Sequence, residues 1–326
     1  MKKFFFLFVL VSLIFITSGC LNKACLCLTP RINEAPSLPR GRGGHAAGIV
    51  DGKVFVVGGS DWSSDHTKKF WLGDSIYFSG NRWQNGPTLP HPLAYTMFAQ
   101  DNTGIYLAGG TDGISNLKSV YHLADLHGSW KSCAQLPMGM ASGSAALFNG
   151  KLYAACGWTD HGITNEMWSL NVKHPDTKWN KCAPLPGPKR AFPALVACND
   201  RLYLFGGTCT DPNSGSQIIL QDAFRYDPSN NAWTRLKDLP CKGYGWAGSS
   251  INKNCIILVG KADGQIHKDI YLIDVRDMHT KKIGETVIQT TTAPLVRLAP
   301  KEFWLIGGEP DSNKNRTSQI TSIKFK

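Results

Sequence analysis

Charged residues are scarce in this 326-residue chain, at 18% of the total, which excludes an intrinsically disordered protein and a long solvated coiled coil. Acidic residues are fewer than basic ones: the chain has 24 Asp and Glu against 35 Lys and Arg, which gives a net charge of +11. The basic residues are scattered, so the charge favours an anionic partner and does not predict nucleic-acid binding. Helix breakers are abundant instead. The 33 Gly and 18 Pro are spread along the chain, exclude a helical bundle and favour a β-rich protein.

Long hydrophobic runs are also few, and the longest lies at the N-terminus. Residues 4–16 are apolar apart from Ser12 and follow two lysines. The run is too short to cross a bilayer comfortably and has the length typical of a signal peptide. Small residues then precede Cys20, a pattern that resembles the bacterial lipobox. We therefore predict a lipoprotein-type signal peptide at 1–19, a lipid anchor at Cys20, a tether at 20–30, and export to the periplasm or cell envelope. An ordinary secretory signal with an incidental Cys20 is the alternative.

Ten cysteines in an exported chain suggest disulfides, but their positions favour few or none. Cys156, Cys198 and Cys255 lie in apolar, strand-like runs, where a free cysteine behaves as a small core hydrophobe. Cys133 and Cys182 follow a Trp at the same distance, which indicates repetition rather than pairing. The spacing of cysteines and histidines matches no zinc site.

The aromatic residues and glycines recur at a fixed interval. A Trp precedes the Pro of a Leu-Pro pair by seven residues four times, and Ile32 holds the same place before Pro39. Apolar runs ending in Gly-Gly alternate with these markers, and two further runs are degraded copies that end in Cys156-Gly157 and Gly260-Lys261. Self-similarity at about 50 residues in strand-rich units is typical of kelch blades. The four Trp–Pro pairs are Trp83–Pro90, Trp130–Pro137, Trp179–Pro186 and Trp233–Pro240.

The repeat predicts an all-β fold, a six-bladed kelch-type β-propeller over residues 31–326. Each unit contains four strands, which in the first unit are expected at 46–50, 53–57, 75–79 and 82–84. The last unit lacks a Trp strand, and residues 31–35 precede the first inner strand. These residues are therefore expected to supply the outermost strand of blade six and to close the ring. A β-sandwich with coincidental Gly-Gly pairs does not explain four identical offsets.

Two features depart from the repeat and suggest a site at the channel mouth. Glu309 directly follows Gly307-Gly308, and Arg316 comes seven residues later. Lys189-Arg190 follows a Leu-Pro pair, and the long loop of the first blade interleaves cations with aromatic residues. Such a mixture suits an anionic sugar, because guanidinium groups bind carboxylates and indole faces pack on sugar rings. Solvated surface charges and inter-blade aromatics are the alternative. The loop residues are Trp62, Lys68, Lys69 and Trp71.

At these residues the chain resembles a known family. The segment Thr292–Phe325, which contains Glu309 and Arg316, resembles the blade that carries the catalytic Glu and its partner Arg in bacterial N-acetylneuraminate epimerases, the sialic acid mutarotases. Leu185–Gly207 is similar to that family's Pro-Arg blade. Gly48–Leu123, with Ala94-Tyr95, is similar to its last two blades. The blades follow in cyclically permuted order, and the resemblance covers residues 32–326.

The resemblance implies an enzyme that interconverts anomers of an acidic sugar, N-acetylneuraminate first among them, by opening and reclosing the ring without a metal or organic cofactor. It implies Glu309 as the base, Arg316 and Arg190 as ligands of the sugar carboxylate, and Tyr95 as a further substrate contact. Two positions depart from the family pattern. The spacing from Glu to Arg is one residue longer here, and Leu93 stands where the family has an Arg.

Other functions stay open from the residues alone, because a propeller does not specify one activity. A non-catalytic exported module that binds glycans or a protein through its rim is the main alternative. Copper oxidase chemistry would need converging His, Tyr and Cys ligands, and the nine histidines show no such grouping.

Overall fold

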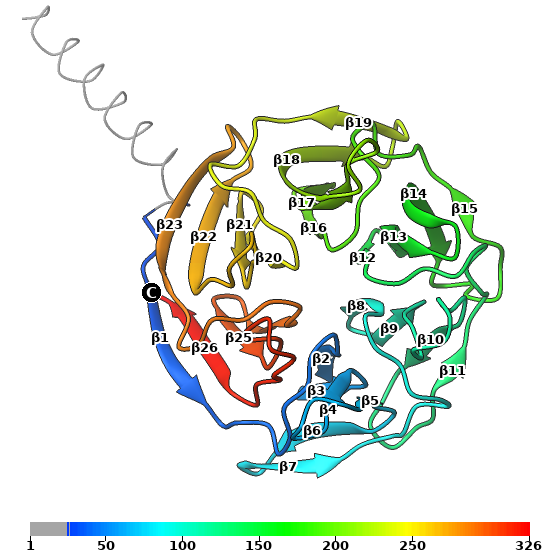
Figure 1. Cartoon of the computed structure of the whole chain (residues 1–326), viewed down its shortest axis with the longest axis vertical. Coiled ribbons are helices and arrows are strands. Elements are labelled where there is room, and N and C mark those ends of the chain that lie inside the picture. The colour runs from blue at the N-terminus through cyan, green and yellow to red at the C-terminus, as the bar shows by residue number, and fades with distance from the viewer. Residues whose placement is uncertain (1–24, 26) are drawn as a thin grey trace, which may run out of the picture.

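A ring of β-sheets makes up the part of the chain that the structure, a computed structural model, describes: Cys25 and residues 27–326 (Figure 1). Six four-stranded antiparallel sheets surround a central axis as blades, so the predicted six-bladed kelch propeller is confirmed. The predicted signal peptide at 1–19 and the predicted lipid anchor at Cys20 lie outside the described residues. Within those residues, no helix has the length and apolar character needed to span a bilayer.

The strands follow the repeat closely, and in blade one the predicted and observed bounds agree to within one residue. Blade one contains β2 (Ala46–Val50), β3 (Lys53–Val57), β6 (Ser75–Ser79) and β7 (Arg82–Asn85), with an inserted hairpin of β4 (Ser60–Trp62) and β5 (Lys69–Trp71). Blade two contains β8 (Met97–Asp101), β9 (Gly104–Ala108), β10 (Val120–Leu123) and β11 (Lys131–Ser132). Blade three contains β12 (Ser144–Phe148), β13 (Lys151–Thr159), β14 (Gly162–Asn171) and β15 (Asn180–Lys181).

The second half of the ring repeats this order. Blade four contains β16 (Ala194–Cys198), β17 (Arg201–Thr210), β18 (Gln217–Asp227) and β19 (Ala232–Arg235). Blade five contains β20 (Ala247–Asn252), β21 (Cys255–Val259), β22 (Asp269–Asp274) and β23 (His279–Glu285). Blade six contains β24 (Leu295–Ala299), β25 (Glu302–Ile306), β26 (Ile320–Phe325) and, on its outer edge, β1 (Pro30–Ala35).

The ends of the described chain meet in blade six. β1 pairs antiparallel with β26, from Pro30 opposite Phe325 to Ala35 opposite Ile320, and Figure 1 shows the blue strand beside the red one. The predicted closure by the N-terminal strand is therefore confirmed. The pairing covers the edge of β26, which would otherwise be an open sheet edge, and connects the start of the described chain to the last blade.

Each repeated Trp bridges two blades through its indole N–H. Trp179, for example, donates a hydrogen bond from Nε1 to the carbonyl oxygen of Ala134 in the preceding blade, at 2.8 Å. The accepting carbonyl lies two or three residues before the Pro of the preceding unit, so each Trp contacts the Leu-Pro segment of the unit before its own. The other bonds run from Trp83 to Ser37, from Trp130 to Pro87 and from Trp233 to Ala183.

The Gly-Gly pairs lie where neighbouring blades approach each other most closely. Gly59 has a φ of 96°, and a Cβ there would lie 2.7 Å from the Cβ of His45. Its N–H donates to the carbonyl of Leu93 in blade two at 2.8 Å. Only glycine satisfies both the positive φ and this close approach without displacing backbone. The second glycine of this pair thus makes a backbone contact between blades.

A closed ring of six backbone hydrogen bonds surrounds the propeller axis, next to the start of the inner strand of each blade. One residue from each blade donates its N–H to the carbonyl of its counterpart in the neighbouring blade, at 2.6 to 3.3 Å, and the sixth bond returns to the first blade. All six residues have φ between 52° and 68°, although four of them are not glycine. Such backbone is strained for L-residues and persists only where surrounding contacts determine it. We call this set the belt; it consists of Gly44, Tyr95, Ser142, Phe192, Gly245 and Thr292.

The cysteines follow the prediction with one exception. Cys133, Cys156, Cys182 and Cys198 are free and buried, as expected. Cys255 was expected to be a free core residue as well, and this is wrong: it forms a disulfide with Cys25, 230 residues earlier. Cys25 is buried in the apolar cluster shared by blades five and six. The disulfide therefore fastens the segment before β1 to blade five.

Reducing this disulfide should destabilise the propeller. A cross-link over so long a loop restricts the unfolded chain, and its loss should lower the free energy of unfolding by about 2–4 kcal/mol. Denaturant unfolding with and without a thiol reductant measures the difference, and a Cys25→Ala variant, which lacks the cross-link, serves as the control that should not respond to reductant. An unchanged unfolding midpoint of the native chain after reduction would contradict the assignment.

Candidate active site

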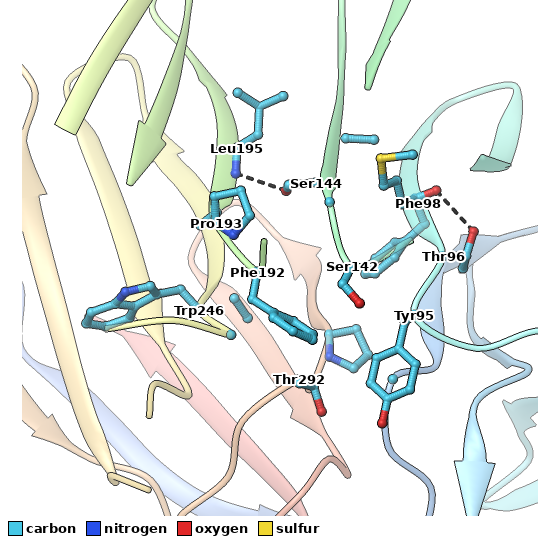
Figure 2. A pocket seen from close by; sticks show the side chains of 18 of the residues that line it. Tyr95, Thr96, Phe98, Ser142, Ser144, Phe192, Pro193, Leu195, Trp246 and Thr292 are labelled. Carbon is cyan, nitrogen blue, oxygen red and sulfur yellow. Dashed lines mark hydrogen bonds between the residues drawn. The ribbon is translucent and has the colours of Figure 1, made fainter. Parts of the chain in front are cut away.

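The belt forms one end of a cavity on the propeller axis. The cavity has a volume of about 160 Å³ and is lined by consecutive residues from the start of the inner strand of every blade. Figure 2 shows the side chains of Tyr95, Ser142, Phe192 and Thr292 close together at one end of it. Because each belt residue sits at the same point of its repeat, four blades present different side chains, Tyr95, Ser142, Phe192 and Thr292, to one common opening, and the other two blades present glycine.

Glu309 lies beside this opening. It follows Gly308 in the chain and forms a backbone bridge with Thr291, next to the belt residue Thr292. The hydroxyl of Tyr95 donates a hydrogen bond to Glu309 Oε1 at 2.8 Å, across from blade two to blade six. The belt therefore positions both partners, since Tyr95 and Thr292 belong to it.

Arg316 lies against the same carboxylate. Its Nη2 is 3.4 Å from Glu309 Oε1 and 3.5 Å from the Tyr95 hydroxyl. The side chain is only 4% exposed, and its Nε is buried without a hydrogen-bond partner. A Cβ at Gly43 would lie 2.7 Å from Arg316 Cδ and 2.8 Å from Glu309 Cγ, so the glycine allows both side chains to pack on the backbone of blade one. The structure thus brings Glu309, Arg316 and Tyr95 together.

The inserted hairpin of blade one adds an ammonium group, that of Lys69, which lies among three aromatic rings. Nζ of Lys69 lies 4.4 Å from the ring centroid of Trp71, 4.9 Å from that of Tyr95 and 5.7 Å from that of Trp62. Nζ of Lys314 lies 4.4 Å from the ring of Trp62. Lys314 was missed from the sequence, although its place in the loop between Glu309 and Arg316 is a signal that could have identified it.

Positive charge exceeds negative charge in this cluster. Lys69, Lys314 and Arg316 contact the same group of side chains as one carboxylate, Glu309. Burial and the neighbouring Arg316 lower the pKa of Lys69, partly opposed by Glu309. Burial and the Glu309 carboxylate raise the pKa of Tyr95, which keeps its hydroxyl protonated as a donor. An anion bound among the three cations would relieve their mutual repulsion.

Two family models match long stretches of the chain. A model of N-acetylneuraminate epimerase matches residues 133–304, more than half of the chain, and a kelch-repeat model named for KLHDC2, KLHL20 and DRC7 matches residues 28–207. The chain belongs to the N-acetylneuraminate epimerase family. The matched region ends five residues before Glu309, so the roles of Glu309 and Arg316 rest on the geometry described above.

Individual members of the epimerase family show the same relationship at low identity. The N-acetylneuraminate epimerase of Haemophilus influenzae (strain 86-028NP) is 25% identical over 185 residues, which are 56% of this chain and 47% of that protein. The Pasteurella multocida (strain Pm70) enzyme of the same name is 38% identical over 101 residues, 31% of this chain and 25% of its own. Kelch-like protein 40 of Xenopus laevis is 25% identical over 205 residues, 61% of this chain and 32% of its own. The chain thus aligns with half or less of the length of these curated relatives, and its permuted blade order stays a prediction.

Two cations predicted for the site of this epimerase-family chain lie elsewhere. Lys68 is exposed and its Nζ lies 5.4 Å from the ring of Phe70, on the opposite face of β5 from Lys69 and Trp71. Neighbouring residues of a strand point to opposite faces, so only Lys69 of the two adjacent lysines contacts Tyr95, the partner of Glu309. The prediction that Lys68 contacts the substrate is not supported.

Arg190 is likewise a structural residue. Its side chain is fully buried, with Nη2 2.8 Å from Asp222 Oδ2 and Nη1 2.9 Å from the carbonyl of Gly206. Arg42 makes the equivalent contacts in blade one, with Asp74 and Gly58, at the same distances along the sequence. The expectation that Arg190 binds a sugar carboxylate is therefore wrong, because its donors are already used. The shared offsets of 16 and 32 residues could have revealed this role.

Leu93 occupies the repeat position of these two arginines, and it is buried. Its carbonyl accepts the N–H of Gly59, just as the carbonyls of Arg42 and Arg190 accept those of Gly308 and Gly157. An arginine at this position would be directed into the blade. The departure at Leu93 therefore does not remove a substrate contact. Among the described residues, no group of three or more His, Cys, Asp and Glu side chains could hold a metal ion.

Replacing Arg190 should affect folding rather than sugar binding. Arg190→Ala leaves Asp222 buried without its partner and should lower the free energy of unfolding by about 3–5 kcal/mol. Denaturant unfolding measures this loss, and Lys189→Ala, at the neighbouring exposed residue, is the control. A stable Arg190→Ala protein with weakened sugar affinity would instead restore Arg190 to the site.

Proposed function

We propose that this chain is a mutarotase that interconverts the anomers of an acidic sugar, most specifically N-acetylneuraminate. The observation that carries the proposal is the Glu309 carboxylate, held by Tyr95 and Arg316 at the opening of the central cavity and surrounded by more positive than negative charge. Relatives named N-acetylneuraminate epimerase support the choice of sugar.

The charge balance selects for an anionic ligand. Arg316 places its guanidinium beside the Glu309 carboxylate, with Nη2 3.4 Å from Oε1. Charge-assisted hydrogen bonds to a guanidinium are stronger than neutral ones and suit the planar geometry of a carboxylate. Trp62 and Trp71 add flat apolar faces beside the cations, on which a pyranose ring could pack. A neutral sugar would leave the excess cations uncompensated.

Glu309 supplies the base for ring opening. Its carboxylate takes the proton of the anomeric hydroxyl while an acid protonates the ring oxygen, and the bond between the anomeric carbon and the ring oxygen breaks. The open keto form then recloses on its other face. A positioned general acid or base contributes about 10²- to 10⁴-fold in rate, which is sufficient for a reaction that also proceeds in water.

We also propose that the chain acts outside the cytosol, in the periplasm or cell envelope, anchored by lipid at Cys20. The apolar leader followed by small residues and a cysteine supports export, and the disulfide between Cys25 and Cys255 supports an oxidising compartment. Fractionation of cells that produce the full chain tests this: the native protein should sediment with membranes and Cys20→Ala should not. Native protein found only in the cytosol would contradict it.

Replacing the base should abolish catalysis. Glu309→Gln keeps the size of the side chain but cannot accept the proton, so the acceleration of anomer exchange should fall by at least about 10²-fold. Proton NMR of freshly dissolved N-acetylneuraminic acid follows the exchange. Glu302→Gln, at a surface carboxylate of the same blade paired with Lys324, is the matched control and should keep full activity.

The anomer exchange measured with the native chain distinguishes a mutarotase from a non-catalytic binding module. A native protein that binds the sugar without accelerating anomer exchange would favour a non-catalytic binding module. Unchanged acceleration in Glu309→Gln would remove Glu309 from the mechanism.

A further inference from the structure

Lys69 has surroundings unlike those of an ordinary surface lysine. Three aromatic rings face its ammonium group within 6 Å of their centroids, and the side chain is half-buried. Aromatic faces stabilise a cation, but they accept no proton from it. No carboxylate among the described residues lies within ion-pair distance of Nζ, and its polar contact is the Tyr95 hydroxyl at 3.5 Å. The ammonium is therefore held in place with its protons available.

The hydrogen bond of this ammonium leads to the catalytic carboxylate. Lys69 Nζ donates to the hydroxyl of Tyr95 at 3.5 Å, and the same hydroxyl donates to Glu309 Oε1 at 2.8 Å. One acid and one base are thus linked through a single hydroxyl, on the side of the opening where blades one, two and six meet.

Ring opening needs an acid as well as a base, and the site offers few candidates. The guanidinium of Arg316 does not release its proton at physiological pH. The Tyr95 hydroxyl is committed to Glu309, and its pKa is raised. Lys314 contacts Trp62 from the exposed loop rather than the Tyr95–Glu309 pair. Lys69 contacts the Tyr95 hydroxyl directly, and burial together with Arg316 makes its proton easier to remove.

We propose that Lys69 is the general acid of ring opening and that Tyr95 connects it to Glu309. This rests on the proposed mutarotase function and names a further catalytic residue for it. In the opening step the anomeric O–H bond breaks and its proton passes to Glu309. The electron pair forms the carbonyl, the bond to the ring oxygen breaks, and an N–H proton of Lys69 passes to that oxygen.

Reclosure uses the same groups in reverse. The hydroxyl formed from the former ring oxygen attacks the other face of the carbonyl carbon, and the neutral Lys69 amine takes the proton of that hydroxyl. Protonated Glu309 returns its proton to the carbonyl oxygen, which becomes the anomeric hydroxyl. If the open form leaves first, protonated Glu309 donates to the Tyr95 oxygen while the Tyr95 proton passes to the Lys69 amine. That transfer restores the ammonium and the carboxylate.

Two substitutions at Lys69 show whether this residue acts as a general acid or only binds the carboxylate of the sugar. Lys69→Met and Lys69→Arg should both lower kcat by about 10²-fold or more, with KM changed less than about threefold, because arginine keeps the charge but does not donate its proton. Lys68→Met, at the neighbouring lysine on the opposite face, should leave both constants unchanged. Tyr95→Phe should lower kcat less than either. Anomer exchange measured by NMR over a range of sugar concentrations gives both constants, and thermal unfolding confirms that each variant is folded.

The pH profile gives a second readout that a structural lysine would not change. In the native chain kcat should fall as the pH rises through the pKa of Lys69, which lies below the ordinary value for lysine because of burial and Arg316. Glu309 and Tyr95 also face Lys69, so Tyr95→Phe should shift this alkaline decline but not remove it. Lys69→Arg should lack the decline.

Wild-type kcat in folded Lys69→Arg, or a rise in KM alone in Lys69→Met, would overturn the proposal and leave Lys69 as a ligand of the sugar carboxylate. A native chain that does not accelerate anomer exchange would instead refute the proposed function itself, so the two failures are distinguishable.

Discussion

Six backbone hydrogen bonds close a ring around the axis of this propeller, and the rest of the structure depends on that closed ring. Each bond joins neighbouring blades through a residue with positive φ, and at four of the six positions this residue is not glycine, so its backbone is strained. Strain of this kind persists because many contacts determine it at once. The closure by β1 and β26, the bonds from Trp to the preceding blade and the Gly-Gly contacts supply those constraints from outside the belt.

Function arises where individual repeats depart from the common pattern. The residue after the Gly-Gly position forms the same backbone bridge in every blade, and only in blade six is it an acid, Glu309. Its partners come from other blades: Tyr95 from the belt, and Lys69 from a hairpin inserted in blade one. A symmetrical ring thus directs different side chains to one opening. Positive charge is in excess around this opening, and burial together with Arg316 lowers the pKa of Lys69.

Much of the fold could be predicted from the sequence, because the repeat encodes contacts of fixed length. Each repeated Trp marks one hydrogen bond between blades, and the missing Trp strand of the last unit indicated closure by residues 31–35. Side-chain direction was harder to predict. Arg190 follows a Leu-Pro pair like a loop residue but points into its blade toward Asp222, and Lys68 and Lys69 differ only by strand alternation. The disulfide joins cysteines 230 residues apart, and no local pattern predicts such a pair.

The central claim is that an excess of positive charge around one carboxylate makes this chain a catalyst for anomer exchange of an acidic sugar. Magnetisation-transfer NMR at equilibrium, with the native full chain and either N-acetylneuraminate or its methyl ester, tests that claim most directly. The account predicts faster exchange between the anomers of the acid and little or no acceleration for the uncharged ester. Equal acceleration of both sugars, or none for the acid, would contradict it.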